Sequence, residues 1–203
     1  MNKRNHLGIP IYTIVLYGDN MVGTTSLIRR YVYNTFDSYF YSTLTDYYTK
    51  VVILDNGKEV KIRFLDIYNY RGHYNKWYFK RADGIMLTYD KTLRRSFENI
   101  ESKLSEMTED INPNTLISLV GCKEDLYIEE QISRDEGENF ANEIGLLFYE
   151  TSAKENSNVN ECFNDFINRI VQINPKENNN IISIKRARSP KRGCLKWLVF
   201  IVF

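Results

Sequence analysis

The chain has 203 residues, 43% of them hydrophobic, and a net charge of +1, which is the composition of an ordinary globular domain with a sizeable core. The charge is uneven, because residues 185–203 carry six basic side chains and no acidic one, which leaves residues 1–184 acidic. An acidic body argues against nucleic-acid binding, whereas a basic tail indicates a segment that approaches an anionic surface.

Apolar, β-branched runs alternate with helix-period segments between residues 11 and 173. The predicted strands are residues 11–17, 47–54, 60–67, 85–89, 116–121 and 146–149. A first helix is predicted to begin near Ser26, and later helices at residues 96–108, 133–144 and 159–173. The turn signal at residues 55–58 makes the second and third strands an antiparallel hairpin. The remaining alternation predicts a three-layer α/β sandwich around a six-stranded, mostly parallel sheet.

A glycine-rich loop follows the first predicted strand. Residues 18–25 have the spacing G-x-x-x-x-G-K-[ST], except that Thr24 stands in the lysine position. A loop of this kind between a strand and a helix cradles phosphate with backbone N–H groups. Thr25 supplies a hydroxyl suited to Mg²⁺, whereas Thr24 cannot supply the missing charge. The candidate phosphate-binding residues are Asn20, Val22, Gly23, Thr24, Thr25 and Ser26.

The two ends of the chain differ from this central domain, which we place at residues 11–173. Residues 1–10 form an N-terminal extension without a signal-peptide pattern. Residues 174–203 form a basic tail whose apolar end is too short to cross a bilayer. The tail therefore predicts peripheral membrane attachment, with Cys194 as a candidate lipidation site. A tail that folds back on the domain, or binds nothing, is the alternative.

Four segments in chain order resemble the Ras superfamily of small GTPases, and its Rab branch most closely. Besides the glycine loop, they are residues 89–99, residues 121–126 with the sequence GCKEDL, and residues 150–154 with the sequence ETSAK. The resemblance runs from residue 11 to about residue 173. It implies a P-loop NTPase-type fold, GTP or GDP with Mg²⁺, effector or regulatory protein partners, vesicle trafficking, a monomer, and a cytoplasmic location peripheral to an intracellular membrane.

The resemblance also implies a base-binding loop. Asp125 would accept two parallel N–H bonds from guanine, a pair of donors that adenine lacks. Lys123 would lay its stem over the base, and the supporting segment is Ser152, Ala153 and Lys154. A solvated carboxylate is the alternative for Asp125. Cys122 replaces the asparagine that ties this loop to the phosphate loop in the family, and is otherwise a small buried filler.

The switch segments resemble those of the family less closely. Thr43 matches the metal-sensing threonine of the first switch loop, and Phe36 matches an aromatic that packs against the base or serves as a hydrophobic anchor. Asp66 begins a D-x-x-G-Q motif in which Asn69 and Tyr70 replace the glycine and the glutamine. Because phosphoryl transfer needs a positioned water and neutralised charge, we assign no catalytic residue.

These features predict a divergent Rab-like guanine-nucleotide-binding protein with weak nucleotide binding and little or no intrinsic GTP hydrolysis. The alternative is a pseudo-GTPase scaffold that recognises protein partners without nucleotide. Tyrosines are abundant around the switch loops, which fits a partner-binding surface under either interpretation. They are Tyr39, Tyr41, Tyr47, Tyr48, Tyr68, Tyr70, Tyr74 and Tyr78.

Overall fold

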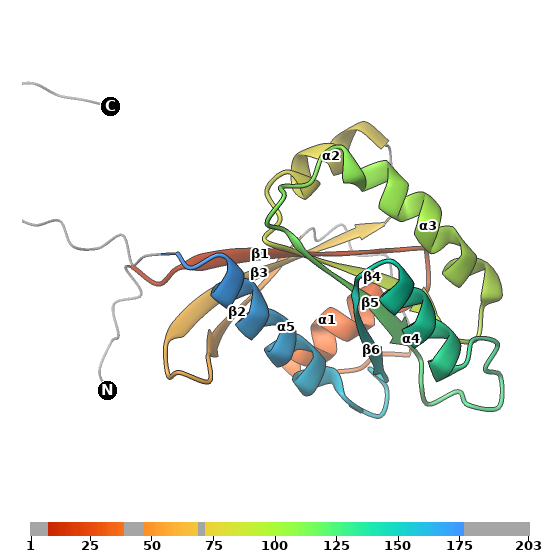
Figure 1. The fold of residues 1–203 in the computed structure, drawn as a ribbon. Helices are drawn as coiled ribbons and strands as arrows, with labels where there is room; N and C mark the ends of the chain where they lie inside the picture. The colour runs from red at the N-terminus through yellow and green to blue at the C-terminus, as the bar shows by residue number, and fades with distance from the viewer. Residues whose placement is uncertain (1–7, 39–46, 69–71, 177–203) are drawn as a thin grey trace, which may run out of the picture.

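The computed structural model describes residues 8–38, 47–68 and 72–176 (Figure 1). Six strands form one sheet in the order β2-β3-β1-β4-β5-β6, and β2 and β3 are its antiparallel pair. The strands are β1 (Ile11–Gly18), β2 (Tyr47–Ile53), β3 (Glu59–Tyr68), β4 (Gly84–Asp90), β5 (Leu116–Cys122) and β6 (Leu147–Thr151). The predicted α/β fold and its hairpin are confirmed.

Helices cover both faces of this sheet (Figure 1). They are α1 (Thr24–Tyr33), α2 (Gly72–Phe79), α3 (Arg94–Thr108), α4 (Arg134–Glu143) and α5 (Val159–Ile173). Ile14 of β1 packs in a core cluster with residues of α1 and α5, such as Phe163. Its neighbour Val15 packs in a second cluster with α2, α3 and α4, which includes Phe97. Because successive strand residues point to opposite faces, the result is a three-layer sandwich.

Two features of this fold differ from the sequence-based expectation. Helix α2 was not predicted, since its segment is rich in aromatic residues and lacks a clear apolar period; Trp77 is exposed while Phe79 is buried. Tyr48 was expected on a partner-binding surface, but its side chain is 7% exposed and its ring lies 6.1 Å from that of Tyr33. The outer strand therefore presents fewer tyrosines to solvent than its sequence suggests.

Gly18 ends β1 at a point where the chain passes very close to β4. A Cβ atom at this position would lie 2.2 Å from the Thr88 hydroxyl oxygen and 2.6 Å from the Thr88 carbonyl oxygen. The end of β1 therefore requires a glycine because of packing.

Gly18→Ala is expected to destabilise the fold by about 1–3 kcal/mol, because the added methyl group overpacks this contact. The melting temperature of the ligand-free protein should fall by several degrees. Gly57→Ala is the matched control, since a Cβ at Gly57 meets nothing within 4 Å and only its φ of +79° is unfavourable. A melting temperature no lower for Gly18→Ala than for Gly57→Ala would contradict the packing argument.

Candidate nucleotide-binding site

The glycine-rich loop leads into the N-terminus of α1. Gly23 is the N-cap residue with a left-handed φ of 113°, no side chain caps the helix, and its first turn holds no acidic residue. The first N–H groups of α1, at Thr24, Thr25 and Ser26, have no partner within the helix, and the N-cap residue supplies no side-chain acceptor. An uncapped helix N-terminus after a left-handed glycine is suited to an anion such as phosphate.

The residue in the lysine position turns inward. The Thr24 side chain is 8% exposed, and its hydroxyl acts to lower the pKa of the nearby Asp66 carboxyl. The Thr25 hydroxyl donates a short hydrogen bond to Asp66 Oδ2. The Thr25 hydroxyl thus ties the loop to the end of β3, and Thr24 brings no positive charge to the loop.

Asp66 has the features of a metal-facing carboxylate. Its Oδ1 atom is buried and has no hydrogen-bond partner among the described residues. Burial raises the pKa of Asp66, and the hydroxyls of Thr25 and Thr24 only partly offset this effect. An orphaned carboxylate oxygen beside the Thr25 hydroxyl offers the oxygen donors that Mg²⁺ prefers, so these residues fit the ion. Thr43, the other predicted metal residue, lies outside the described residues.

Asp66→Asn is expected to stabilise the ligand-free protein at neutral pH. Because the pKa of Asp66 is raised in the folded protein, its ionised carboxylate destabilises the fold. This penalty is absent at pH values below the pKa in the unfolded state and complete above the pKa in the folded state. We expect a gain of about 1 kcal/mol, or roughly 2–4 °C, that fades as the pH falls toward about 4. Thermal melts across this pH range measure it, with the exposed Asp37→Asn as the control. A gain that does not depend on pH would contradict the assignment.

The base-binding loop is ordered around Asp125, whose side chain is 10% exposed. The Ser152 hydroxyl donates to Asp125 Oδ1 at 2.6 Å and accepts a bond from the Glu155 N–H at 3.0 Å. Lys154 Nζ lies 3.7 Å from Asp125 Oδ2. The carboxylate is therefore held by its neighbours and is not freely solvated, while its contact with guanine stays a prediction.

Lys123 and Cys122 join this loop to its surroundings. Lys123 has a left-handed φ of 64°, and its Nζ lies 2.6 Å from Asp90 Oδ2 at the end of β4. Cys122 is buried, and burial raises the pKa of its thiol to about 12, so the thiol stays neutral. A Cβ atom at Gly23 would lie 3.6 Å from the Cys122 Cβ, so Cys122 packs directly against the phosphate loop. Packing thus replaces the side-chain amide of the family at this junction.

Arg30 is a structural support that the sequence did not reveal. From the last turn of α1, its Nε donates to the Ala153 carbonyl at 2.6 Å and its Nη2 to the Lys154 carbonyl at 3.0 Å. The helix whose N-terminus forms the phosphate site therefore also holds the base-binding segment. No local pattern marks such a contact, since it joins residues 123 positions apart.

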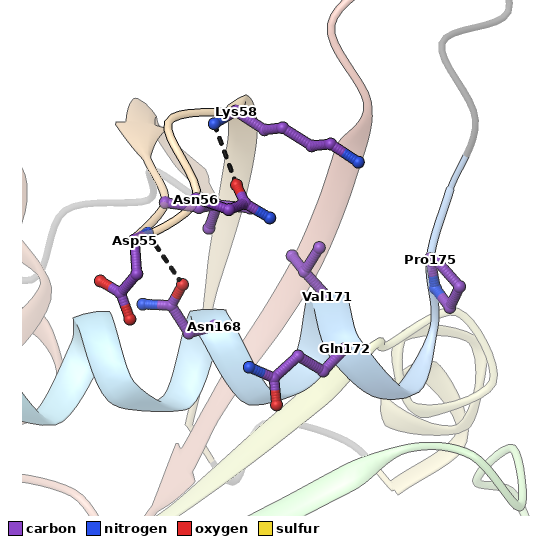
Figure 2. Close-up of a pocket in the computed structure, with 8 residues that line it drawn as sticks. Asp55, Asn56, Lys58, Asn168, Val171, Gln172 and Pro175 are labelled. Carbon is purple, nitrogen blue, oxygen red and sulfur yellow. Dashed lines mark hydrogen bonds between the residues drawn. The ribbon is translucent and has the colours of Figure 1, made fainter.

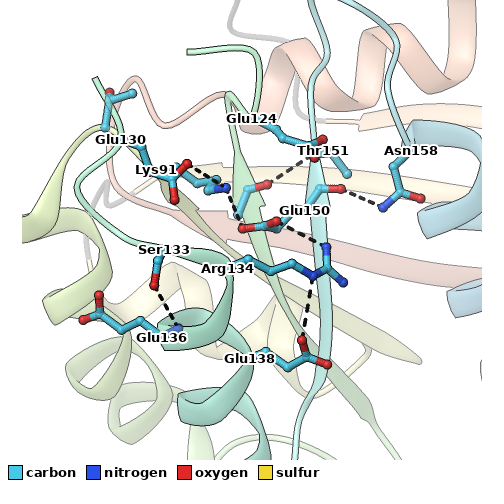
Figure 3. A network of polar contacts seen from close by, with 12 residues as sticks. Lys91, Glu124, Glu130, Ser133, Arg134, Glu136, Glu138, Glu150, Thr151 and Asn158 are labelled. Atoms are coloured by element: carbon cyan, nitrogen blue, oxygen red, sulfur yellow. Dashed lines mark hydrogen bonds and ion pairs between the residues drawn. The ribbon is translucent and has the colours of Figure 1, made fainter. Parts of the chain in front are cut away.

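A charged network with a buried centre adjoins the candidate base-binding segment at Glu150 and Thr151 (Figure 3). Lys91 Nζ is 2.7 Å from Glu150 Oε1, and the two side chains are 5% and 3% exposed. Arg134 Nη1 lies 3.3 Å from Glu150 Oε2, and Glu130 lies 3.5 Å from Lys91. The Asn158 amide also donates to the Glu150 carbonyl oxygen at 2.7 Å. This network fixes the backbone just before Ser152, and sequence reasoning missed it.

The candidate residues gather at one edge of the sheet. The loop after β1, Asp66 near the end of β3, and the segments that end β5 and β6 all lie at the carboxyl ends of parallel strands, where ligands of such sheets bind. Val22 is buried, Asn20 and Phe36 are exposed, and the predicted contact of Phe36 with a base stays a prediction. Cys194 lies outside the described residues.

A pocket of about 270 Å³ lies elsewhere, between the β2–β3 turn and α5 (Figure 2). The Asp55 N–H donates to Asn168 Oδ1 across it at 3.3 Å. The turn joins the end of β2 to the start of β3. The pocket therefore lies at the amino-terminal end of β3, whereas the phosphate loop lies at the carboxyl ends of the parallel strands. It is therefore separate from the candidate site.

The site combines a glycine loop that leads into a helix without a side-chain cap, a buried aspartate near the end of β3, and a candidate base loop held by its neighbours. These features are those of a nucleotide-binding protein of the P-loop class. The Ras family model matches residues 13–172, and the chain belongs to the Ras family. Ras-related protein RIC2 of rice is 35% identical over 80% of this chain and 76% of its own length. Human Ras-related protein Rab-15 is 34% identical over 82% of this chain and 80% of its own length. Fission yeast GTP-binding protein ypt3 is 35% identical over 80% of this chain and 77% of its own length.

Membership in this family sets the general function. Its Ras- and Rab-related members bind GTP or GDP with Mg²⁺ and interact with effector or regulatory proteins, and the Rab relatives connect it with membrane trafficking. Within residues 8–38, 47–68 and 72–176, every helix is too short or too polar to cross a membrane.

Proposed function

We propose that this protein is a divergent Rab-like guanine-nucleotide-binding protein with weak nucleotide affinity and little or no intrinsic GTP hydrolysis. It acts through effector or regulatory partners at an intracellular membrane, to which its basic tail attaches it. The observation that carries the proposal is the contrast between two halves of one site. Asp125 is held in place for a base, whereas Thr24 is turned inward and leaves the phosphates without a lysine.

Each part of the site has a separate role in this proposal. The N–H groups at the start of α1 bind phosphate oxygens, and Asp125 accepts the guanine N–H groups while Ser152 orients it. Thr25 and Asp66 would hold Mg²⁺, which when bound would neutralise part of the phosphate charge. Specificity for the base is therefore retained, while the binding energy from the outer phosphates is reduced.

Slow hydrolysis follows from what the sequence omits. Phosphoryl transfer depends on a positioned water and on cations that neutralise the developing charge. Thr24 supplies no cation, and Tyr70 lacks the amide that would orient the water. Neither function has an assigned replacement, so GTP once bound is expected to persist until a partner acts.

A specific contact favours the pseudo-GTPase alternative. The Thr25 hydroxyl bonds to Asp66 and the Thr24 side chain is buried, so the loop accommodates both side chains internally without a ligand. In that case the loop serves as a rigid structural turn, and partner recognition does not depend on nucleotide.

Calorimetric titration of the full, nucleotide-stripped chain with GDP and GppNHp, with and without Mg²⁺, separates the two proposals. Wild-type protein is expected to bind with a Kd in the micromolar range. Thr24→Lys should bind about 10–100-fold more tightly, because a charge-assisted hydrogen bond adds about 1.5–3 kcal/mol. Thr24→Ser, which keeps a neutral hydroxyl beside Asp66, is the matched control and should bind like the wild type.

The other outcomes are equally informative. Binding by Thr24→Lys alone would establish a pseudo-GTPase whose loop lacks one charge. No binding by either protein would place the defect at Cys122 or in the segment after Asp66, and would leave a scaffold as the function.

A further inference from the structure

A buried lysine of α3 faces the phosphate loop. The Lys103 side chain is 3% exposed, and its Nζ lies 2.8 Å from Asp19 Oδ1. The same Nζ lies 4.6 Å from the centre of the Tyr17 ring in β1. A lysine is rarely buried to this degree unless its charge is paired. The position of Lys103 next to the glycine loop therefore indicates a role in that loop.

The partner of Lys103 belongs to the loop itself. Asp19 follows Gly18, and its Oδ2 accepts a second bond from the Asn99 amide at 2.7 Å. Burial acts to raise the pKa of Asp19. The hydrogen bonds from Lys103 and Asn99 and the positive charges of Lys103 and Arg95 outweigh this effect, so the pKa of Asp19 is lowered. The carboxylate is therefore fully ionised at neutral pH, and both of its oxygens are held by α3.

This charge matters because the loop lacks its own cation. Thr24 is neutral, and Asp66 is a second carboxylate near the start of α1. An unpaired Asp19 would add a negative charge within the loop that must accept the phosphates of a nucleotide. Repulsion between such charges is substantial at the effective dielectric constant of a partly buried site.

We propose that Lys103 is the charge-compensating residue of this phosphate loop. By pairing with Asp19 it cancels the negative charge of the loop and holds the carboxylate against α3, away from the anion site at the start of α1. Lys103 acts through Asp19 and is a positioning residue, not a phosphate ligand. The inference rests on the proposed nucleotide-binding function and adds the source of electrostatic compensation in a loop without lysine.

A purely structural ion pair has a different signature. A buried pair that only supports the fold would change the affinity for every ligand to a similar degree, through the stability of the loop. Charge compensation instead predicts an effect that grows with the number of phosphates on the ligand. Guanosine, GDP and GppNHp share a base and differ in phosphate charge, so they separate the two roles.

The test is a double-mutant cycle in the full chain with Lys103→Met, Asp19→Asn and the double variant. Lys103→Met should leave guanosine binding unchanged, weaken GDP binding about tenfold and weaken GppNHp binding further. Asp19→Asn should have the opposite effect, because Lys103 then adds an uncompensated positive charge. The double variant, neutral at both positions, should return close to the wild type.

Two controls complete the cycle. Lys80→Met removes an exposed lysine that lies 3.3 Å from Asp110, and should leave all affinities unchanged. The effect of Lys103→Met on GppNHp should also shrink at high salt, as expected for a charge effect. The double variant keeps the experiment decisive if a single variant fails to fold, because it leaves no buried ion without its partner. A GppNHp affinity of the double variant far below that of the wild type would overturn the inference.

The failures are distinguishable. Wild-type protein that binds neither GDP nor GppNHp would refute the proposed function, and this inference with it. Nucleotide binding by the wild type, with equal losses for guanosine and GppNHp in Lys103→Met, would refute only the inference and leave a structural ion pair.

Discussion

Asp125→Asn is expected to weaken GDP binding about 100-fold and to create binding of xanthosine diphosphate. A carboxylate accepts from both the N1–H and the N2–H of guanine, whereas an amide accepts one bond and donates another. Asparagine therefore places its NH₂ group against the guanine amino group, but matches the carbonyl that xanthine carries there. A lost charge-assisted bond and an unpaired donor together account for about 2.7 kcal/mol.

The structure makes this substitution a clean test. Ser152 donates to Asp125 Oδ1, and an asparagine carbonyl can accept the same bond, so the support of the loop is kept. Glu124→Gln is the matched control, because it neutralises the adjacent carboxylate, which accepts only a 3.3 Å bond from the Ser157 hydroxyl. Competition between GDP and xanthosine diphosphate measures the change. If both variants bind GDP equally, Asp125 does not read the base.

The backbone of this site was predictable from local sequence. Strand periodicity and glycine spacing placed the phosphate loop after β1, and the turn at residues 55–58 gave the hairpin, because these signals depend on neighbours in the chain. The order of the strands brought Asp66, Asp125 and Ser152 to one edge without any knowledge of side chains. The family resemblance supplied their expected roles.

The supports of the site were not predictable in the same way. Arg30 lies in the last turn of α1, Lys91 directly follows β4, and Lys103 lies within α3. For charged residues at such positions, a sequence pattern favours a solvated interpretation. Each pairs with a group far along the chain: Arg30 with the Ala153 carbonyl, Lys91 with Glu150 and Lys103 with Asp19. Only the packing of the helices on the sheet removes these side chains from water. Helix α2 was missed for a different reason, since its aromatic sequence has no helical period.

These supports link the two halves of the site. α1 begins at the phosphate loop and ends on the base loop through Arg30, while α3 holds the phosphate loop through Lys103. Cys122 packs against Gly23 between the two loops. A site that places few positive charges against the phosphates depends strongly on the residues that fix its geometry. Orientation of the bound nucleotide is then a large part of what the site contributes.

Glu150→Gln is expected to destabilise the protein by about 3 kcal/mol, and to lower its melting temperature by roughly 6–12 °C. Lys91 is buried, and loss of the carboxylate at 2.7 Å leaves its charge with only Glu130 at 3.5 Å. An incompletely compensated buried charge is more destabilising than the loss of a surface pair, because desolvation of the ion is no longer offset. Thermal melts of the ligand-free chain measure the effect.

Two variants give this prediction its sharpest form. Glu138→Gln removes a carboxylate 3.8 Å from Arg134 in an exposed pair, and should change stability by less than about 0.5 kcal/mol. The double variant Lys91→Met/Glu150→Gln should recover part of the loss, since no buried ion then lacks its partner. Because Glu150 lies just before the Ser152 segment, amide exchange in residues 151–155 should also accelerate in Glu150→Gln. Equal melting temperatures for Glu150→Gln and Glu138→Gln would show that the network adjoining the base-binding segment does not stabilise it.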